Sequence, residues 1–251
     1  MNDNLNPEYK NLIDSLKISL KKMQKEIDHR EREENKGHLF KTYQPALFKI
    51  IDEFIVEHEI VASHFANGED KTHGEYFRLK INPIALKAPF CKRCFDKPLG
   101  YPGDYLMMEM LYSNTRCGDS VFAQIFDAHT LQLPFANAVR ERCARIEKEL
   151  KETICRNPES SILSVASGPA WEIRNLQKNT KLDHSKFFLL DQDKSALEFA
   201  RKKLNGLETN ISCLEKNVVD FVKEKQTSKF DLVYSMGLFD YLPQKLARRL
   251  V

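Results

Sequence analysis

The 251-residue sequence has no long apolar run, no excess of one charge and no repeated or low-complexity tract. No run approaches the roughly 20 apolar residues of a membrane helix, so we expect no membrane partner. The 39 basic and 36 acidic residues are mixed along the chain, which gives no electrostatic argument for nucleic acid. The polar N-terminus, MNDNLNPEYK, is unlike a signal peptide. With no export signal, the six cysteines favour reduced thiols, and we predict a cytoplasmic (cytosolic) protein.

Apolar residues in the first part of the chain recur at intervals of three and four, the spacing of one helix face. They predict helices over 12–27 and 40–55, and a third that begins near Pro134, which suits a first helical turn. Packing in the core of a helical bundle explains these stripes. Pairing of the charged first helix with a second copy of itself is the alternative. We therefore predict an all-helical N-terminal domain over residues 1–155.

The pattern changes after the polar link at 156–160. Short apolar runs at 162–166, 187–190, 211–215 and 230–235 alternate with stretches of helical spacing. This alternation predicts an α/β fold, a Rossmann-like doubly wound parallel sheet whose first four strands lie in a domain over residues 156–251. In such a sheet a ligand lies across the carboxyl ends of the strands.

Glycine is scarce where a nucleotide-binding turn would carry several. The segment SILSVASGPAWEI, residues 161–173, holds only Gly168 between its strand and its helix. Small residues let a backbone approach a ligand closely, although a strand-to-helix turn without a ligand would look similar. A dinucleotide dehydrogenase would carry a fuller glycine motif. An adenosyl group with an amino-acid tail needs less phosphate binding, which favours S-adenosylmethionine.

Polar residues follow the other predicted strands in the order that an adenosyl group requires. Asp191 lies 23 residues after Gly168, where a carboxylate can accept hydrogen bonds from ribose hydroxyls, and Asp193 is placed to cap the next helix. Asn217 follows the third strand and could bind an adenine edge. A loop at 235–241 follows the fourth strand. A solvated carboxylate and a turn asparagine are the plainer alternatives for single positions, but the four strand ends together predict a cofactor site.

Residues 161–242 resemble the first four strands of class I S-adenosylmethionine-dependent methyltransferases. ILSVASGPA matches the first motif, although Ser164, Ala166 and Ala170 replace the usual acidic residue and glycines. FFLLDQD matches the ribose motif, LEKNVVDF the adenine segment, and FDLVYSMGLFDYL the fourth-strand motif. SGPAWEI, VYSMGLFDYLPQKLARRL and KPLGYPGDYLMMEMLY further resemble a bacterial subgroup linked to synthesis of an extracellular factor, 3-hydroxypalmitic acid methyl ester. That closer resemblance covers about residues 95–251.

The resemblance implies roles for particular residues. The loop at Gly168 would hold the methionine moiety with support from Glu172, and the loop after the fourth strand would border the transferred methyl group. The implied cofactor-binding residues are Tyr101, Ala166, Ser167, Gly168, Glu172, Asp191, Gln192, Asn217, Val218, Ser235, Met236 and Gly237. The motif GYPGDY at 100–105 would form part of a helical lid, or else a Pro-Gly turn that caps a helix. The candidates for acceptor contact and catalysis are Asp104, Tyr105, Asp240 and Tyr241.

The predicted function is S-adenosylmethionine-dependent O-methylation of a small or acyl carboxylic acid. A carboxylate acceptor is already a nucleophile, whereas an alcohol or amine would need a base such as Asp104, Asp240 or His129. A non-catalytic cofactor-binding or dimerisation module is the alternative, and a nicotinamide oxidoreductase is disfavoured by the glycine-poor turn. Cys91 and Cys94 form a lone C-x-x-C pair without further ligands at matching spacing, so no metal is expected.

The related fold continues for three more strands, whereas this sequence ends at Val251, so we expect an incomplete sheet and weak or no activity of this chain alone. The open edge of the fourth strand could pair with another chain. A homodimer through that edge or through the first helix is therefore a further prediction.

Overall fold

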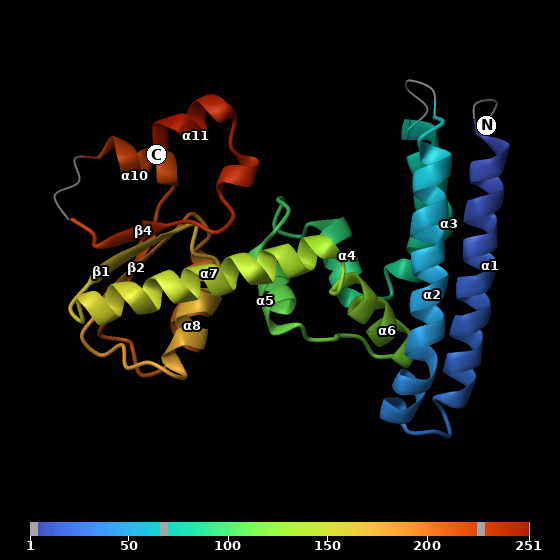
Figure 1. Ribbon diagram of the computed structural model, residues 1–251, viewed down its shortest axis with the longest axis horizontal. Coiled ribbons are helices and arrows are strands. Elements are labelled where there is room, and N and C mark those ends of the chain that lie inside the picture. Colours follow the sequence, from blue (N-terminus) through green and yellow to red (C-terminus); the bar gives the residue numbers. More distant parts are fainter. Residues whose placement is uncertain (1–4, 66–69, 225–228, 251) are drawn as a thin grey trace. The chain divides into compact units, whose positions relative to one another are not determined.

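The computed structural model describes residues 5–65, 70–224 and 229–250, and the chain divides into two compact units (Figure 1). We call residues 1–102 and 114–133 the helical unit. Residues 103–113 and 134–251 form the sheet unit.

The helical unit contains α1 (Pro7–Arg30), α2 (Lys36–Ala62), α3 (Asp70–Ala85), α4 (Pro89–Asp96) and α6 (Val121–Thr130). The starts of α1 and α2 are set locally, because the side chains of Asn6 and Asn35 accept hydrogen bonds from N–H groups of the first turn. The predicted stripe on α1 is buried, with Leu16, Leu20 and Ile27 in a core shared with α2 and α3. The stripe therefore packs within the chain, as its simplest interpretation required.

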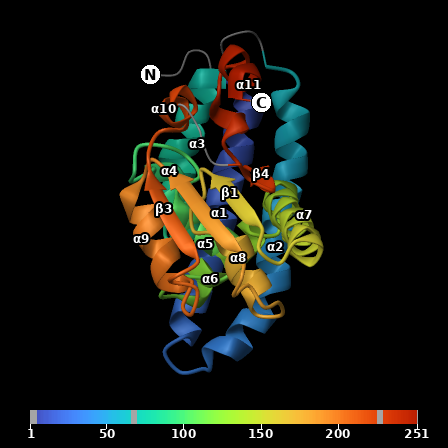
Figure 2. The same cartoon turned by 90° about the vertical axis from the view of Figure 1, so that its left-hand side faces the viewer.

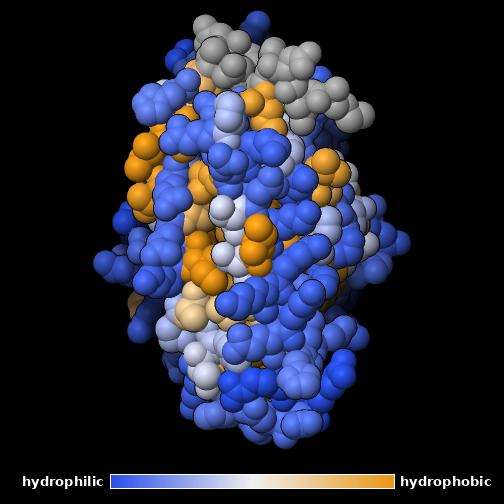
Figure 3. Space-filling model, turned by 90° about the vertical axis from the view of Figure 1, so that its right-hand side faces the viewer, coloured by the Kyte–Doolittle hydropathy of each residue, from blue (hydrophilic) through white to orange (hydrophobic). Residues whose placement is uncertain are grey.

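Figure 3 shows a face of the helical unit that is mostly hydrophilic, with apolar side chains in scattered groups. This distribution agrees with the burial of the helix stripes, since singly exposed apolar residues are normal on a protein surface. Within the described parts of the chain, no helix combines the length and the apolar character needed to cross a membrane.

The sheet unit begins with α5 (Tyr105–Ser113) and α7 (Pro134–Arg156). Strands and helices then alternate: β1 (Ser161–Val165), α8 (Trp171–Gln177), β2 (Lys186–Asp191), α9 (Lys194–Lys203), β3 (Ile211–Glu215), α10 (Val218–Lys223) and β4 (Leu232–Tyr234). A short 3-10 helix η1 (Phe239–Tyr241) and α11 (Gln244–Leu250) follow. The predicted fold class is confirmed, because all four strands are parallel and α-helices connect them.

The strands lie in the order β3-β2-β1-β4, which Figure 2 shows face-on. β1 pairs with β2 on one side and with β4 on the other, so that Ile162 lies beside both Phe187 and Leu232. The chain first winds outward through β2 and β3 and then crosses back to β4. This reversal of direction between β1 and β4 is the switch point at which open α/β sheets bind ligands.

Side chains alternate between the two faces of the sheet. On one face, Ile162, Phe187 and Ile211 share a core with residues of α7, α8 and α9. On the other face, Leu163 and Leu190 belong to a smaller core against which α10 packs. Figure 1 shows α8 and α10 on opposite sides of the sheet. Burial on both faces explains why β1 is an almost continuous apolar run in the sequence.

The division of the chain differs from the predicted boundary at residues 155 and 156. α5 and α7 belong to the sheet unit, although the sequence assigns both to the helical domain. Leu150 and Ile154 of α7 are buried in the core beneath the sheet. Glu109 of α5 binds Arg174 of α8 through two hydrogen bonds of 2.6 and 3.1 Å. An apolar stripe predicts that a helix is buried but does not identify the surface that it packs against, which explains the difference.

Candidate cofactor site at the strand ends

The loop after β1 has positive φ values, as a glycine-rich turn would have, although two of the three positions are alanine. Ala166, Gly168 and Ala170 have φ values of +53°, +52° and +48°. An L-residue in this left-handed region costs about 1–2 kcal/mol, and glycine avoids that cost. Ser167 N–H donates to the carbonyl of Leu190 at 3.1 Å, which anchors the loop to β2. The sequence predicted a loop of small residues between this strand and the next helix, but it did not predict that two alanines take up the conformation of glycine.

Asp191, at the end of β2, holds this loop in place. One carboxylate oxygen accepts the Gly168 N–H at 2.9 Å, and the other accepts the Asp193 N–H at 2.9 Å. Burial raises the pKa of Asp191, and these backbone donors oppose that rise by stabilising the anion. A Cβ built on Gly168 would have no atom within 4 Å, so a ligand can approach the loop there. A carboxylate has about four lone-pair positions, which leaves capacity for ribose hydroxyls.

Glu172, in the first turn of α8, is fully buried and accepts a 2.6 Å hydrogen bond from the hydroxyl of Tyr234. Burial is the main cause that raises the pKa of Glu172 to about 7, and burial also raises the pKa of Tyr234. The second oxygen of Glu172 has no partner among the described residues. Glu172 therefore keeps one buried carboxyl oxygen without a partner, and its place beside the methionine moiety stays a prediction.

Buried side-chain atoms without a hydrogen-bond partner concentrate in the sheet unit. The described residues contain five such atoms, of which four are Ser167 Oγ, Glu172 Oε2, Ser235 Oγ and Arg142 Nε. An unsatisfied buried polar group costs about 1–3 kcal/mol, so these atoms are expected to have a partner when the protein functions. Ser167 follows β1 and Ser235 follows β4, the two strands that flank the switch point. The two serine hydroxyls and the Glu172 oxygen fit an amino-acid tail and ribose hydroxyls, the polar groups of S-adenosylmethionine.

Asn217 caps α10, since its Oδ1 accepts the Val219 N–H at 2.9 Å. Its Nδ2 donates to the side-chain oxygen of Gln192 at 2.8 Å. One hydrogen and one lone pair of the Asn217 amide remain for an adenine edge. Val218 is partly buried and packs against the smaller core of the sheet unit. The predicted adenine residues are thus neighbours, but Asn217 also serves as a helix cap.

Arg142, which no sequence motif singles out, lies beside the loop that follows β4. Its Nη1 donates to Asp240 at 3.1 Å, and its Nη2 is 3.7 Å from a Cβ built on Gly237. Met236, in the same loop, packs against the core beneath the sheet. No local signal could have identified Arg142, because it precedes Asp240 by 98 positions and meets it only when α7 packs on the sheet unit.

The boundary between the units falls inside the predicted GYPGDY lid, after Pro102, so Tyr101 belongs to the helical unit. Asp104 is 1% exposed and caps α5, because one oxygen accepts the N–H groups of Leu106 and Met107 at 3.0 Å each. This is the capping role that the sequence offered as the alternative. The ring of Tyr105 packs against Phe199 of α9 at a centroid distance of 5.3 Å.

Gly103 lies against Tyr241, and both residues belong to the sheet unit. A Cβ on Gly103 would come within 2.7 Å of the Tyr241 hydroxyl oxygen, and the φ of Gly103 is +76°. Two independent constraints, close contact and a left-handed backbone, therefore require glycine at this position. The contact brings the second half of the predicted lid motif to the predicted acceptor residue Tyr241.

His129 and Cys91 both lie in the helical unit. His129 is 5% exposed, and its Nε2 lies 2.7 Å from a carboxylate oxygen of Asp52, which belongs to the same unit. Cys91 hydrogen-bonds with Thr130 at 3.2 Å, and burial raises the pKa of its thiol to about 12. Neither Cys91 nor Cys94 forms a disulfide within the described residues, and no group of three or more metal-binding side chains occurs in these segments.

The strand order and the parallel pairing are those of a Rossmann-like sheet. Residues 162–251 match a methyltransferase domain. This match supports S-adenosylmethionine-dependent methyl transfer in general, with S-adenosylmethionine as the usual methyl donor. The methyltransferase class of the sequence resemblance is thereby supported, while the extracellular-factor subgroup stays a prediction.

A solved structure of a possible exported protein from Bordetella parapertussis is similar to this chain, with 20% sequence identity and a TM-score of 0.50. The similarity covers 66% of this chain and 56% of that chain, so the sequence spans little more than half of that protein's length. At this identity the likeness concerns the fold alone. Among curated proteins, none matches this chain.

Proposed function

We propose that the protein is an S-adenosylmethionine-dependent O-methyltransferase whose acceptor is a small or acyl carboxylic acid. The observation that carries the proposal is the group of unpartnered buried atoms on Ser167, Glu172 and Ser235 beside the switch point of a methyltransferase domain. These atoms have the chemistry to bind a cofactor with an amino-acid tail, and the Asp191 carboxylate faces the same loop.

When bound, S-adenosylmethionine would supply a methyl group activated by its sulfonium. Asp191 would bind the ribose hydroxyls, and the loop around Gly168, with Glu172, would hold the amino-acid tail. Val218 would contact the adenine ring. Methyl transfer is an in-line displacement that creates no oxyanion, so the protein contributes mainly alignment and exclusion of water.

Arg142 supports a carboxylate as the acceptor. Asp240 engages Nη1 of Arg142 at 3.1 Å, and Nη2 lies beside the loop at Gly237 and makes no hydrogen bond with any described residue. A guanidinium N–H can hold one carboxylate oxygen and leave the other oxygen free to attack. Because a carboxylate is ionised at neutral pH, no proton has to be removed. Asp240 then positions Arg142, and Tyr241 borders the acceptor.

Calorimetric titration with S-adenosylmethionine, its demethylated product and NAD tests the cofactor. We expect the first two to bind and NAD not to bind. Asp191→Ala should weaken binding at least tenfold, because hydrogen bonds to a charged group contribute about 1.5–3 kcal/mol each. Asp220→Ala is the matched control, since Asp220 is an exposed carboxylate on α10. Binding of NAD alone, or unchanged affinity in Asp191→Ala, would contradict the assignment.

Transfer of a radiolabelled methyl group to 3-hydroxypalmitate, palmitate and benzoate tests the acceptor class. A carboxyl methyl ester releases labelled methanol in mild base, whereas a methyl ether or methylamine does not. Arg142→Leu should raise the KM for the carboxylate and leave the affinity for S-adenosylmethionine unchanged. Base-stable label would refute the carboxylate acceptor, and cofactor binding without any transfer would favour a non-catalytic module.

A further inference from the structure

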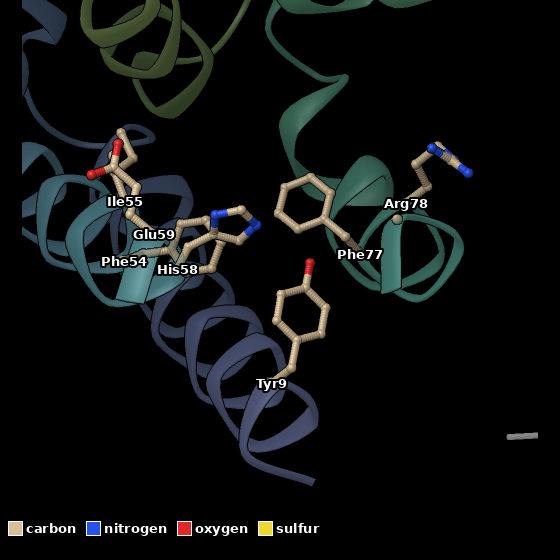
Figure 4. A pocket seen from close by; sticks show the side chains of 8 residues that line it. Tyr9, Phe54, Ile55, His58, Glu59, Phe77 and Arg78 are labelled. Atoms are coloured by element: carbon tan, nitrogen blue, oxygen red, sulfur yellow. The ribbon is translucent and has the colours of Figure 1, made fainter. Parts of the chain in front are cut away.

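A cavity of about 340 Å³, open to the surface, lies between α1, α2 and α3 in the helical unit. Figure 4 shows its lining, to which α1 contributes Tyr9 and α3 contributes Phe77. α2 contributes Phe54, Ile55 and His58. The proposed methyltransferase function makes no use of this cavity, because every residue that lines it belongs to the helical unit.

Aromatic rings form the walls of the cavity. Phe54 and Phe77 stack across α2 and α3 with a centroid distance of 5.9 Å and an interplanar angle of 23°. His58 packs against Phe54 at 5.5 Å and edge-on against Tyr9 at 5.7 Å. Flat ring faces and edges favour a planar aromatic guest, because aromatic pairs gain energy beyond simple burial in stacked and edge-to-face arrangements.

Tyr9 supplies a hydroxyl group to the lining of this cavity. Its side chain is held edge-on by Phe65 at 5.2 Å and by His73 at 4.8 Å, and the residue is only 2% exposed. Its hydroxyl makes no hydrogen bond with any described residue, and Figure 4 shows it pointing into the space between His58 and Phe77. Burial raises the pKa of Tyr9, so the hydroxyl stays protonated and is available as a donor.

The volume of the cavity and the charges of its lining residues limit the kind of compound that it can bind. A cavity of roughly 150 Å³ is enough for benzene, so 340 Å³ accommodates a molecule with two fused rings. Glu59 and Arg78 line the cavity with opposite charges, and neither forms an ion pair within the described residues. Their charges offset each other, which favours an uncharged guest over an acid or an amine.

We propose that the helical unit binds an uncharged, planar aromatic compound of about two fused rings, with an oxygen that accepts a hydrogen bond from Tyr9. The rings lie among Phe54, His58 and Phe77, and the oxygen faces the Tyr9 hydroxyl. All the lining residues belong to the helical unit, and the test of this site does not depend on methyl transfer.

Equilibrium dialysis of the full chain against 2-acetylnaphthalene and naphthalene tests the proposal. Both probes should bind with dissociation constants in the millimolar range or tighter. Tyr9→Phe keeps the ring but removes the donor, so it should weaken binding of the ketone several-fold to about tenfold without changing naphthalene. Ile55→Trp should abolish binding of both probes by filling the cavity.

Val56→Trp is the matched control, because Val56 is the next residue on α2, is 58% exposed and does not line the cavity. Circular dichroism checks that each variant folds. Absence of binding by both probes, or equal binding in Ile55→Trp, would overturn the proposal. An unchanged affinity of Tyr9→Phe for the ketone would refute the proposed hydrogen bond between the Tyr9 hydroxyl and the bound compound. A dimer that dissociates in Ile55→Trp would assign the cavity to a second copy of the chain.

Discussion

Replacement of Glu172 by glutamine should change how the stability of the sheet unit depends on pH. Glu172 is fully buried, and its carboxyl accepts the Tyr234 hydroxyl at 2.6 Å while its other oxygen lacks a partner among the described residues. Burial raises its pKa from 4.5 to about 7. Glutamine has nearly the same shape and can accept the same hydrogen bond, but it carries no charge at any pH.

The magnitude follows from the difference in proton binding between the folded and unfolded chain. Between pH 4.5 and 7 the unfolded chain has lost the Glu172 proton while the folded chain keeps it, so stability falls as the pH rises. A shift from 4.5 to about 7, at about 1.4 kcal/mol per pKa unit, corresponds to about 3 kcal/mol. About 2 kcal/mol of this should be lost between pH 5.5 and 8.

Urea unfolding, monitored by the fluorescence of Trp171, measures this effect. Trp171 is the single tryptophan of the chain and precedes Glu172, so its signal reports on the sheet unit. The advantage of Glu172→Gln over the parent should grow by about 2 kcal/mol from pH 5.5 to pH 8. Glu198→Gln, at an exposed glutamate of α9, should show no such trend. A stability difference between Glu172→Gln and the parent that is constant across this range would refute the reasoning.

Three further substitutions test the loops around the site, with urea unfolding as the measurement. Gly103→Ala should destabilise the sheet unit by about 1–3 kcal/mol, and adding Tyr241→Phe should recover the steric part of that loss but not the part due to the left-handed backbone. Ala166→Gly should leave stability unchanged or raise it by up to about 1 kcal/mol, whereas Ala166→Val should lower it, because a branched side chain disfavours positive φ. Asp193→Ala should cost about 1 kcal/mol, because it removes the N-cap hydrogen bond to Ser195. An effect of the opposite sign in any of the three would contradict the geometry of these loops.

Local sequence patterns were sufficient for the strands of the sheet unit and for the longest helices, but not for α3, α4 and α6. Alternating apolar runs predicted all four strands, because a parallel strand buried on both faces must be apolar along its length. The cap at Asp193 depends on groups within three positions of the helix start, so its role could be predicted from the sequence. The order of Gly168, Asp191 and Asn217 also follows from local position, since each lies at the end of a strand.

The tertiary structure decided which distant residues complete the site. Glu172 meets Tyr234 across 62 positions, and Arg142 meets Asp240 across 98. These pairs depend on strand order and helix packing, which hydrophobic periodicity does not specify. The same reason explains why the sequence placed α5 and α7 with the helical domain.

The loop after β1 shows most clearly which features follow from the sequence and which from the tertiary structure. The sequence alone determined that small residues follow the strand and that Asp191 ends the next one. Only the tertiary structure decided that Ala166 and Ala170 adopt left-handed backbone conformations. The hydrogen bond from Gly168 to Asp191 and the anchor from Ser167 to Leu190 hold the loop against β2, and such long-range contacts can outweigh a local preference of about 1–2 kcal/mol per residue.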